Sequence, residues 1–374
     1  MDGVLASEIK PAPGLRAFFE KTQAFHGTAA FLGGFFWDAA TLRRIDQLFD
    51  NFLLFVYLAF LGFCLVLSIR LDRGRGVPAW ATKRREALQT LVHFFFGGLF
   101  SAYLIFYFKS ASLSKSFLFV LVLAGLLLAN EYGRKHLAEG RVQLLLYYFC
   151  LFSFFLYFIP VVTGWMGRGV FITAGVLGGL GVWLVFRLAG EVASFRFSEA
   201  RTVIGIRFAD CGALFAVLGI LYWMGVIPPV PLSLVHAGIY HAVVPGNPHY
   251  RLTQEAPPFW NLWSHDDRDF EYQPGDEAYC FTAIFAPKGF ELSIWHRWEW
   301  WNEKQGKWEE SDRLPFRVSG GREGGYRGFT TKRKLRPGRY RVRVVTGDGD
   351  ELGVLPLRVR VKSEVSRKWK VIEY

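Results

Sequence analysis

The chain has 374 residues, of which 52% are hydrophobic, and it contains 37 phenylalanines and 13 tryptophans. With its positive mean hydropathy, this composition does not fit an ordinary soluble enzyme. The net charge is +12, but most of the excess lies in the loops of the apolar half and forms no basic stripe on a soluble unit. The composition therefore predicts a membrane protein that contacts the lipid bilayer and has no nucleic-acid partner.

Residues 1–50 form an N-terminal segment with one candidate helix, Thr22–Leu42, which contains His26, Asp38 and several glycines. If this helix crosses the membrane, the segment before it is cytoplasmic. If it lies in the interface as an amphipathic helix, that segment is external. We favour a spanning helix because Asp38 sits near one end, within reach of water or Arg43. The first residues lack a basic start followed by an apolar core, so we expect the first spanning helix to act as the targeting signal.

Residues 51–231 contain a succession of long apolar runs, close together in the chain. They are Phe52–Ile69, Leu88–Phe108, Phe117–Asn130, Leu144–Thr163, Val170–Leu188 and Gly212–Pro231. Most are near the ~20 residues that a helix needs to cross a hydrocarbon core of about 30 Å. The sequence therefore predicts an α-helical transmembrane bundle of six or seven spans, the seventh being Thr22–Leu42.

The basic residues of the connecting loops predict the orientation, because basic loops stay on the cytoplasmic side. The loops after the first, third and fifth runs hold Arg70, Arg73, Arg75, Lys83, Arg84, Arg85, Arg134, Lys135, Arg141, Arg187, Arg196, Arg201 and Arg207. The intervening loops hold only Lys109, Lys115 and Arg168. We therefore expect everything after Pro231 to lie outside the cytoplasm.

The composition changes after Pro231. Residues 232–270 are rich in histidine, proline and aromatic residues and are interpreted as an external linker, extended and ordered in part. Residues 271–374 alternate with a period of two, as in RYRVRV and LPLRVRV, where arginines oppose apolar residues. The GDGD between these two runs is typical of a hairpin turn. This pattern predicts an all-β domain, a sandwich of immunoglobulin-like architecture.

Several motifs in order carry a resemblance to a known family. They are PPVPLSLVHAGIYH, FAPKGFELSIWHRW, SGGREGGYRG and LRPGRYRVRVVTGDGDELG. Together they resemble bacterial polytopic membrane proteins that end in the domain of unknown function family 2914. The resemblance covers roughly Tyr272–Val361, and the helical part, with GGFFWDAATLRRID, is similar to the membrane region of such proteins. The resemblance implies architecture only, because the family has no assigned activity. With the orientation of the loops, we expect a multi-pass protein of the bacterial inner membrane whose C-terminal domain is periplasmic or extracellular.

Sites for chemistry are scarce in the sequence. Cys64, Cys150 and Cys211 fall in or beside apolar runs, and we interpret Cys280 as a core residue rather than a reactive thiol. The histidines of 232–270, with Asp266 and Asp267, have no spacing typical of a metal site. We therefore expect no metal, no cofactor and no catalytic residue.

The strongest candidate surface is aromatic and basic. In ELSIWHRWEWW the alternation sends Trp295, Arg297, Glu299 and Trp301 to one face and His296, Trp298 and Trp300 to the other. One set can line the core, and the other needs a cover within the protein, the membrane or a partner. The candidate partner-binding residues on this strand and the following loop are Trp295, Arg297, Trp298, Arg322, Tyr326 and Arg327.

We therefore expect a non-enzymatic membrane anchor whose external β-domain binds a protein or glycan of the cell envelope; the oligomeric state is left open. The alternative is a transporter or membrane-enzyme subunit that acts through the helices. A polar cavity lined by His93, Asp38 and Arg187 would favour that alternative, because an anchor has no reason to maintain one.

Overall fold

The computed structural model describes residues 33–42, 45–74, 76–78, 82–110, 117–133, 137, 139–190, 198–228, 230–246, 249–256, 266–287, 290–320, 324–361 and 367–374, with the backbone only for 198–207. It divides into an N-terminal unit, Met1–Arg43, and a second unit, Arg44–Tyr374. In the N-terminal unit residues 33–41 are helical. The predicted helix Thr22–Leu42 is therefore described only in about its second half.

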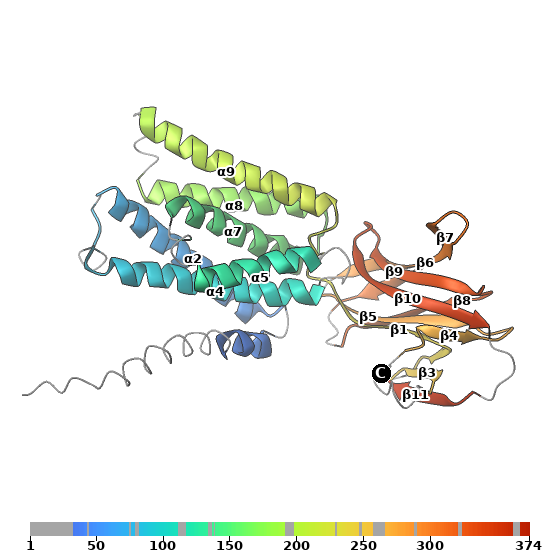
Figure 1. The fold of residues 1–374 in the computed structure, drawn as a ribbon. Helices are drawn as coiled ribbons and strands as arrows, with labels where there is room; N and C mark the ends of the chain where they lie inside the picture. Colours follow the sequence, from blue (N-terminus) through green and yellow to red (C-terminus); the bar gives the residue numbers. More distant parts are fainter. Residues whose placement is uncertain are drawn as a thin grey trace, which may run out of the picture. The chain divides into compact units, whose positions relative to one another are not determined.

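The second unit begins with apolar helices. They are α2 (Leu48–Asp72), α4 (Arg85–Ser110), α5 (Phe117–Tyr132), α7 (Gly140–Thr163), α8 (Arg168–Leu188) and α9 (Ser198–Trp223), as seen in Figure 1. Within the described ranges, α2, α4, α7 and α8 are the 4 helices long and apolar enough to cross a membrane. This number is lower than the predicted six or seven spans.

Two of the predicted spans fall short for different reasons. Helix α5 has 16 residues, and at 1.5 Å per residue it measures about 24 Å, less than the roughly 30 Å of a hydrocarbon core. Helix α9 has 26 residues, and the stretch of it with described side chains, Phe208–Trp223, is apolar but shorter than 18 residues. Its first half carries Glu199, Arg201 and Arg207, and the described helix ends before Pro228.

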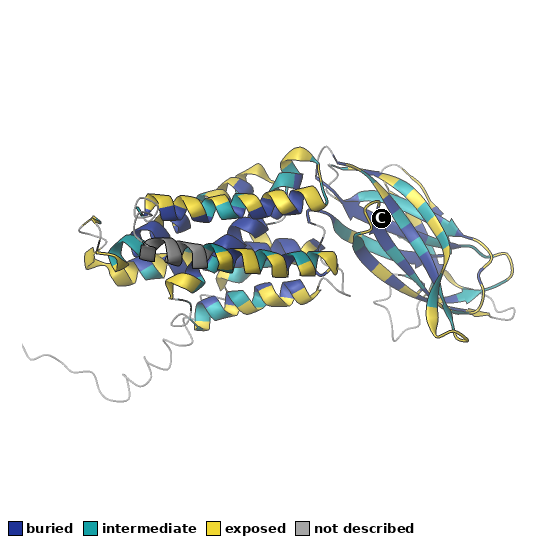
Figure 2. Ribbon diagram, turned by 90° about the horizontal axis from the view of Figure 1, so that it is seen from above, coloured by how far each residue is buried: buried dark blue, intermediate teal, exposed yellow. Residues whose placement is uncertain are grey.

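The helices expose large apolar side chains on their outer faces. On α2, Phe52, Phe55, Phe60 and Phe63 are all more than half exposed. Figure 2 shows the same alternation of buried and exposed stripes along the other helices. A contiguous apolar surface of this kind is rare on soluble monomers and is typical of a surface covered by lipid or by another protein.

Polar groups inside the bundle are paired across helices. Tyr103 on α4 donates to the Cys150 carbonyl of α7 at 2.9 Å, and Tyr107 donates to that of Ser153 at 3.0 Å. His93 on α4 and Asn130 on α5 share two hydrogen bonds. The ring Nδ1 of His93 lies 3.0 Å from the side-chain oxygen of Asn130, and the side-chain nitrogen of Asn130 donates to the backbone carbonyl of His93 at 2.8 Å. These bonds fix the register between neighbouring helices, where an unpaired polar group is costly.

The rest of the second unit is built of strands. They are β1 (Ser233–Tyr240), β2 (Ala242–Val244), β3 (Arg251–Glu255), β4 (Asp269–Tyr272), β5 (Ala278–Phe285), β6 (Glu291–Asn302), β7 (Lys307–Ser319), β8 (Tyr326–Lys332), β9 (Gly338–Thr346), β10 (Glu351–Val361) and β11 (Trp369–Glu373). They form a large sheet with the order β4-β10-β9-β6-β7, a middle sheet β1-β5-β8 and a small sheet β11-β3-β2. A sheet-rich C-terminal region was predicted and is confirmed.

The main core lies between the large sheet and the middle sheet. Trp298 and Ile294 from β6 meet Cys280 and Ile284 from β5, all with no exposed area. Cys280 is thus a core residue, as predicted, and burial raises the pKa of its thiol. The period-two alternation is also confirmed, because Tyr340, Val342 and Val344 of β9 are buried while the arginines between them face away.

The small sheet covers the other side of the middle sheet. Leu252 and Val243 from the small sheet pack with Tyr240 and Phe281 from the middle sheet in a second, smaller core. The result is three layers rather than the two of an immunoglobulin-like sandwich. A second difference is that β4 pairs with β10 in parallel, although the other strand pairs are antiparallel.

The segment interpreted as a linker, residues 232–270, contains strands. Strand β1 pairs along its length with β5 at the centre of the middle sheet, and Ile239 of β1 reaches the main core. Strands β2 and β3 form most of the small sheet, and β4 begins within the same segment. The β-region therefore starts at Ser233 and not at residue 271.

Candidate functional site

The outer face of the large sheet gathers arginine and tryptophan side chains. Cross-strand pairing aligns Arg313, Arg297 and Arg343 in one row over β7, β6 and β9. The next row holds Glu310, Glu299 and Arg341, and the following one contains the Trp308–Trp301 pair. We call this the arginine–tryptophan face, and it consists of Trp295, Arg297, Glu299, Trp301, Trp308, Glu310, Arg313, Arg339, Arg341 and Arg343.

Guanidinium groups stack on the indole rings of this face. Arg313 lies 5.1 Å from the ring centre of Trp295, Arg339 lies 4.9 Å from that of Trp301, and Arg341 lies 4.5 Å from that of Trp308. A stacked guanidinium keeps its planar donors oriented, so it loses less freedom when it binds a carboxylate or a phosphate. The tryptophans therefore hold the arginines ready for planar anions.

One buried carboxylate organises the centre of the face. Glu299, whose side chain is 6% exposed, contacts Arg341, Arg343 at 3.4 Å and Arg297 at 3.7 Å. Arg297 also binds Glu310 at 2.6 Å, and Arg343 binds Glu351 at 2.7 Å. Arg317 on the edge strand β7 and Arg358 and Arg360 on β10 are also exposed, so arginines outnumber carboxylates. The arrangement suits an extended anionic ligand.

The predicted partner-binding residues do not form one surface. Trp295 and Arg297 belong to the arginine–tryptophan face. Trp298 points the other way and is completely buried in the main core, so its assignment as a partner-binding residue is corrected. Alternation had separated these two sets but could not say which one faced inward, since both contain tryptophan.

The remaining predicted residues follow β7. Tyr326 packs against the main core. Arg327 lies on the far side of the middle sheet, 5.2 Å from the ring centre of Tyr374 and 5.9 Å from that of Tyr250. The described end of the glycine-rich loop is thus separated from Trp295 and Arg297 by the core. Arg322 lies outside the described residues.

A buried ionic cluster, which we call the His241 cluster, escaped the sequence analysis. It comprises His241, Glu255, Asp267 and Arg367. His241 Nδ1 lies 2.8 Å from Asp267 Oδ2, and Arg367 Nε lies 3.2 Å from Glu255 Oε1. Arg367 also donates to the Glu271 carbonyl at 2.6 Å. His241 and Asp267 are 26 positions apart, and no spacing rule reveals a contact over such a distance.

Burial shifts the carboxyl groups of the His241 cluster. Desolvation and the neighbouring Glu271 raise the pKa of Glu255 to about 7, against the opposing charges of His241 and Arg367. Burial also raises the pKa of Asp267, despite its hydrogen bond with His241. The imidazole of His241 stacks on Phe270 at 3.9 Å and its side chain is 5% exposed. We interpret the cluster as a link between the small sheet and β4.

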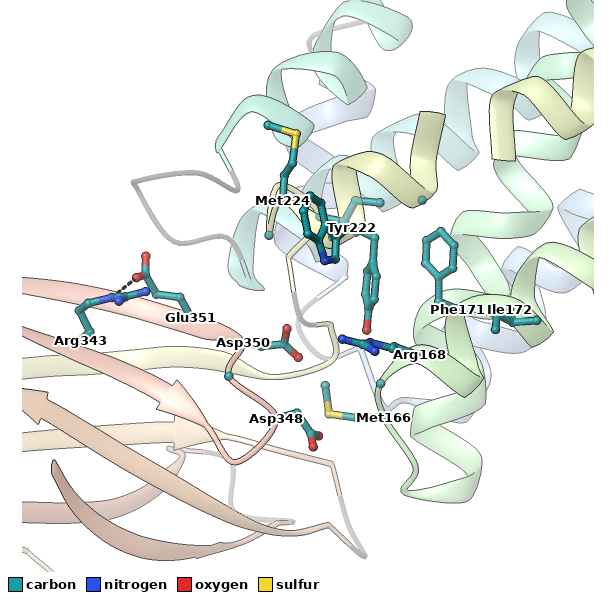
Figure 3. Close-up of a pocket in the computed structure, with 16 residues that line it drawn as sticks. Met166, Arg168, Phe171, Ile172, Tyr222, Met224, Arg343, Asp348, Asp350 and Glu351 are labelled. Carbon is teal, nitrogen blue, oxygen red and sulfur yellow. Dashed lines mark hydrogen bonds and ion pairs between the residues drawn. The ribbon is translucent and has the colours of Figure 1, made fainter. Parts of the chain in front are cut away.

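A cleft opens where α8 and α9 meet the β9–β10 hairpin (Figure 3). Its volume is about 990 Å³. Helices supply Phe171, Ile172 and Tyr222, and the hairpin supplies Asp348 and Asp350. The α7–α8 connection adds Met166, and the first residue of α8 is Arg168, whose guanidinium points towards Tyr222 and Asp350 in Figure 3. The GDGD motif, predicted as a turn and confirmed as one, thus forms one wall.

Comparisons with known proteins give limited information. Residues 291–359 match the family described as Protein of unknown function (DUF2914), which confirms the resemblance from β6 to most of β10. No curated protein matches the chain. One similar solved structure is the alkylpurine DNA glycosylase AlkC of Pseudomonas fluorescens, bound to DNA containing an abasic site analog. It is 13% identical, with 85% of this chain and 99% of that chain covered, and the TM-score of 0.19 is too low to indicate a common fold.

Proposed function

We propose that this is a non-enzymatic, multi-pass protein of the bacterial inner membrane that presents its β-domain to the periplasm or the cell exterior, where it binds an anionic polymer of the cell envelope. The four long apolar helices are its spans, and the proposal adds the shorter apolar helices α5 and α9 as two more, for which the bilayer thins locally, with the N-terminal helix as the candidate seventh span. The arginine–tryptophan face is the binding surface. The single observation that carries this proposal is the set of guanidinium groups stacked on Trp295, Trp301 and Trp308.

An extended anionic polymer fits this face better than a small ligand. The face is a sheet surface that carries several arginines in successive rows. Repeated carboxylates or phosphates along a chain can meet these rows in register. Arginine binds such groups through two parallel hydrogen bonds, which lysine cannot do.

Membrane insertion is supported by the helices. Their outer faces carry exposed phenylalanines, and Trp165 and Trp223 are 75% and 82% exposed near the helix ends that adjoin the β-domain. Tryptophan is enriched where a helix meets the membrane interface. The basic loops at the opposite helix ends support a cytoplasmic position for that side.

The alternative, transport or catalysis through the bundle, needs polar groups available inside it. His93 is engaged by Asn130 in both directions. Arg187 lies 5.6 Å from the ring centre of Trp183 rather than in a cavity with His93. Asp38 belongs to the separate N-terminal unit. These positions favour the anchor.

The test is binding of the full chain, in lipid nanodiscs, to polygalacturonate as an anionic polymer and to dextran as a neutral one. The variant Arg313→Gln/Arg339→Gln removes two exposed arginines of the face. A hydrogen bond to a charged group contributes about 1.5–3 kcal/mol, but water and salt weaken such a bond at an exposed surface. We therefore expect the loss of both arginines to reduce the affinity about tenfold. The matched control, Arg251→Gln/Lys370→Gln on the small sheet, should bind like the wild type. Equal binding by all three proteins would refute the assignment.

A further inference from the structure

The walls of the cleft at the β9–β10 hairpin differ in character. The helical wall is apolar and aromatic, with Phe171, Ile172 and Trp223. The hairpin wall is acidic, with Asp348 and Asp350, and Arg168 supplies a positive charge at the base. Glu351 and Arg343 also line the cleft but bind each other at 2.7 Å. A ligand here meets one cation, two carboxylates and an apolar surface.

The apolar wall continues along the outside of the helices. Ile172 is 57% exposed and is followed at helical spacing by Val176 and Leu180, which are 57% and 53% exposed. On α9, Ile220 and Val217 extend the wall in the same way, at 58% and 52% exposed. The cleft is therefore continuous with helix faces that are suited to acyl chains. A free, soluble ligand has no use for this apolar extension.

We infer that the cleft binds the headgroup of a membrane phospholipid that carries both a phosphate and a primary ammonium group, a phosphoethanolamine lipid, with its acyl chains along α8 and α9. Arg168 faces the phosphate. Asp348 and Asp350 face the ammonium group. The inference rests on membrane insertion of the helices, but not on the binding role of the arginine–tryptophan face.

The charges argue for this headgroup against other lipids. The phosphate of a purely anionic headgroup can bind Arg168, but such a headgroup carries no positive charge to neutralise the carboxylates of Asp348 and Asp350. A quaternary ammonium has no N–H to donate, whereas a primary ammonium donates three hydrogen bonds. Burial and the negative charge of the nearby Asp348 both raise the pKa of Asp350, which means that they destabilise its carboxylate. A cation bound beside Asp350 stabilises that carboxylate and so lowers its pKa again.

Native mass spectrometry of the detergent-solubilised full chain tests the inference. The probes are phosphatidylethanolamine, phosphatidylcholine and phosphatidylglycerol with identical acyl chains. The wild type should retain phosphatidylethanolamine about tenfold more than the other two, as expected for one or two charge-assisted hydrogen bonds. Asp348→Asn/Asp350→Asn should abolish this preference, and Arg168→Gln should reduce retention of all three lipids. Asp269→Asn/Glu303→Gln, which changes charge by the same amount on exposed residues outside the cleft, should behave like the wild type.

Each result has one reading. An unchanged ethanolamine preference in the Asp348→Asn/Asp350→Asn variant, or a wild type that prefers phosphatidylglycerol, would overturn the inference. Recovery of the wild type in the membrane fraction is scored first, by carbonate extraction. Failure there refutes membrane insertion, and with it the proposed function. A membrane-inserted protein without lipid preference refutes the cleft assignment alone.

Discussion

His296 makes folding of the β-domain sensitive to acid. The ring lies in the main core with no exposed area. Its Nε2 is 3.1 Å from the Thr282 hydroxyl of β5, and its Nδ1 is 2.8 Å from the Thr330 hydroxyl of β8. Burial disfavours the imidazolium and lowers the pKa of His296 to about 3. The folded domain therefore keeps this ring neutral where an unfolded chain protonates it.

The sign and size of the effect follow from this difference. The folded pKa is depressed, so the unfolded state binds an additional proton once the pH falls below about 6.5. Stability is lost as the pH decreases from there towards the folded pKa of about 3. The slope is about 1.4 kcal/mol per pH unit, which gives about 2 kcal/mol between pH 7 and pH 5.

Urea unfolding of the full chain in detergent, followed by tryptophan fluorescence at pH 7 and pH 5, measures this loss. The comparison variant is His296→Leu/Thr282→Val/Thr330→Val, which removes the titrating ring together with its two hydroxyl partners. The difference between the proteins isolates His296, because the other titrating groups are common to both. We expect the wild type to lose about 2 kcal/mol more than the variant. A difference under about 0.5 kcal/mol would show that the ring reaches water or is charged in the folded state.

Three further outcomes are expected. A fragment of residues 232–374 should unfold cooperatively, whereas Asn261–Tyr374 should not, because it lacks β1, which pairs along its length with the central strand β5 of the middle sheet; similar melting curves would contradict the pairing. A reporter active only outside the cytoplasm should work after Tyr374 and fail at Gly76, and the reverse result would invert the orientation. Because the pKa of Glu255 is raised to about 7, the small sheet should lose stability as the pH rises through about 7. Hydrogen exchange of β3 and β11, corrected for intrinsic rates, should then increase, and unchanged protection would refute the raised pKa.

The sequence predicted those elements whose pattern is local. Alternation in RYRVRV placed the valines of β9 inside, and the GDGD turn was recognised from composition. Apolar runs located the helices. The sequence analysis failed for residues 232–270, because β1 carries a register irregularity between Leu234 and His236 that breaks the period of two.

The candidate site was predictable only in part, because its geometry depends on strand pairing. Trp295 and Arg297 were identified from one strand, but their partners Arg313 and Arg343 come from two others. The orientation of Trp298 is decided by which face of β6 meets the middle sheet. The cleft joins Arg168 to Asp350 across nearly half of the chain, a distance that no single-sequence pattern covers.

In-cell photo-crosslinking tests the central claim most directly. Pro315 is exposed on the edge strand β7 and pairs with Trp295, so Pro315→benzoylphenylalanine places a probe on the arginine–tryptophan face without removing a hydrogen bond of the sheet. Val371, 56% exposed on the small sheet, carries the control probe. The account predicts a covalent product with an anionic envelope polymer from position 315, lost in the Arg313→Gln/Arg339→Gln background, and none from position 371. A product with a protein, or equal products from both positions, would contradict it.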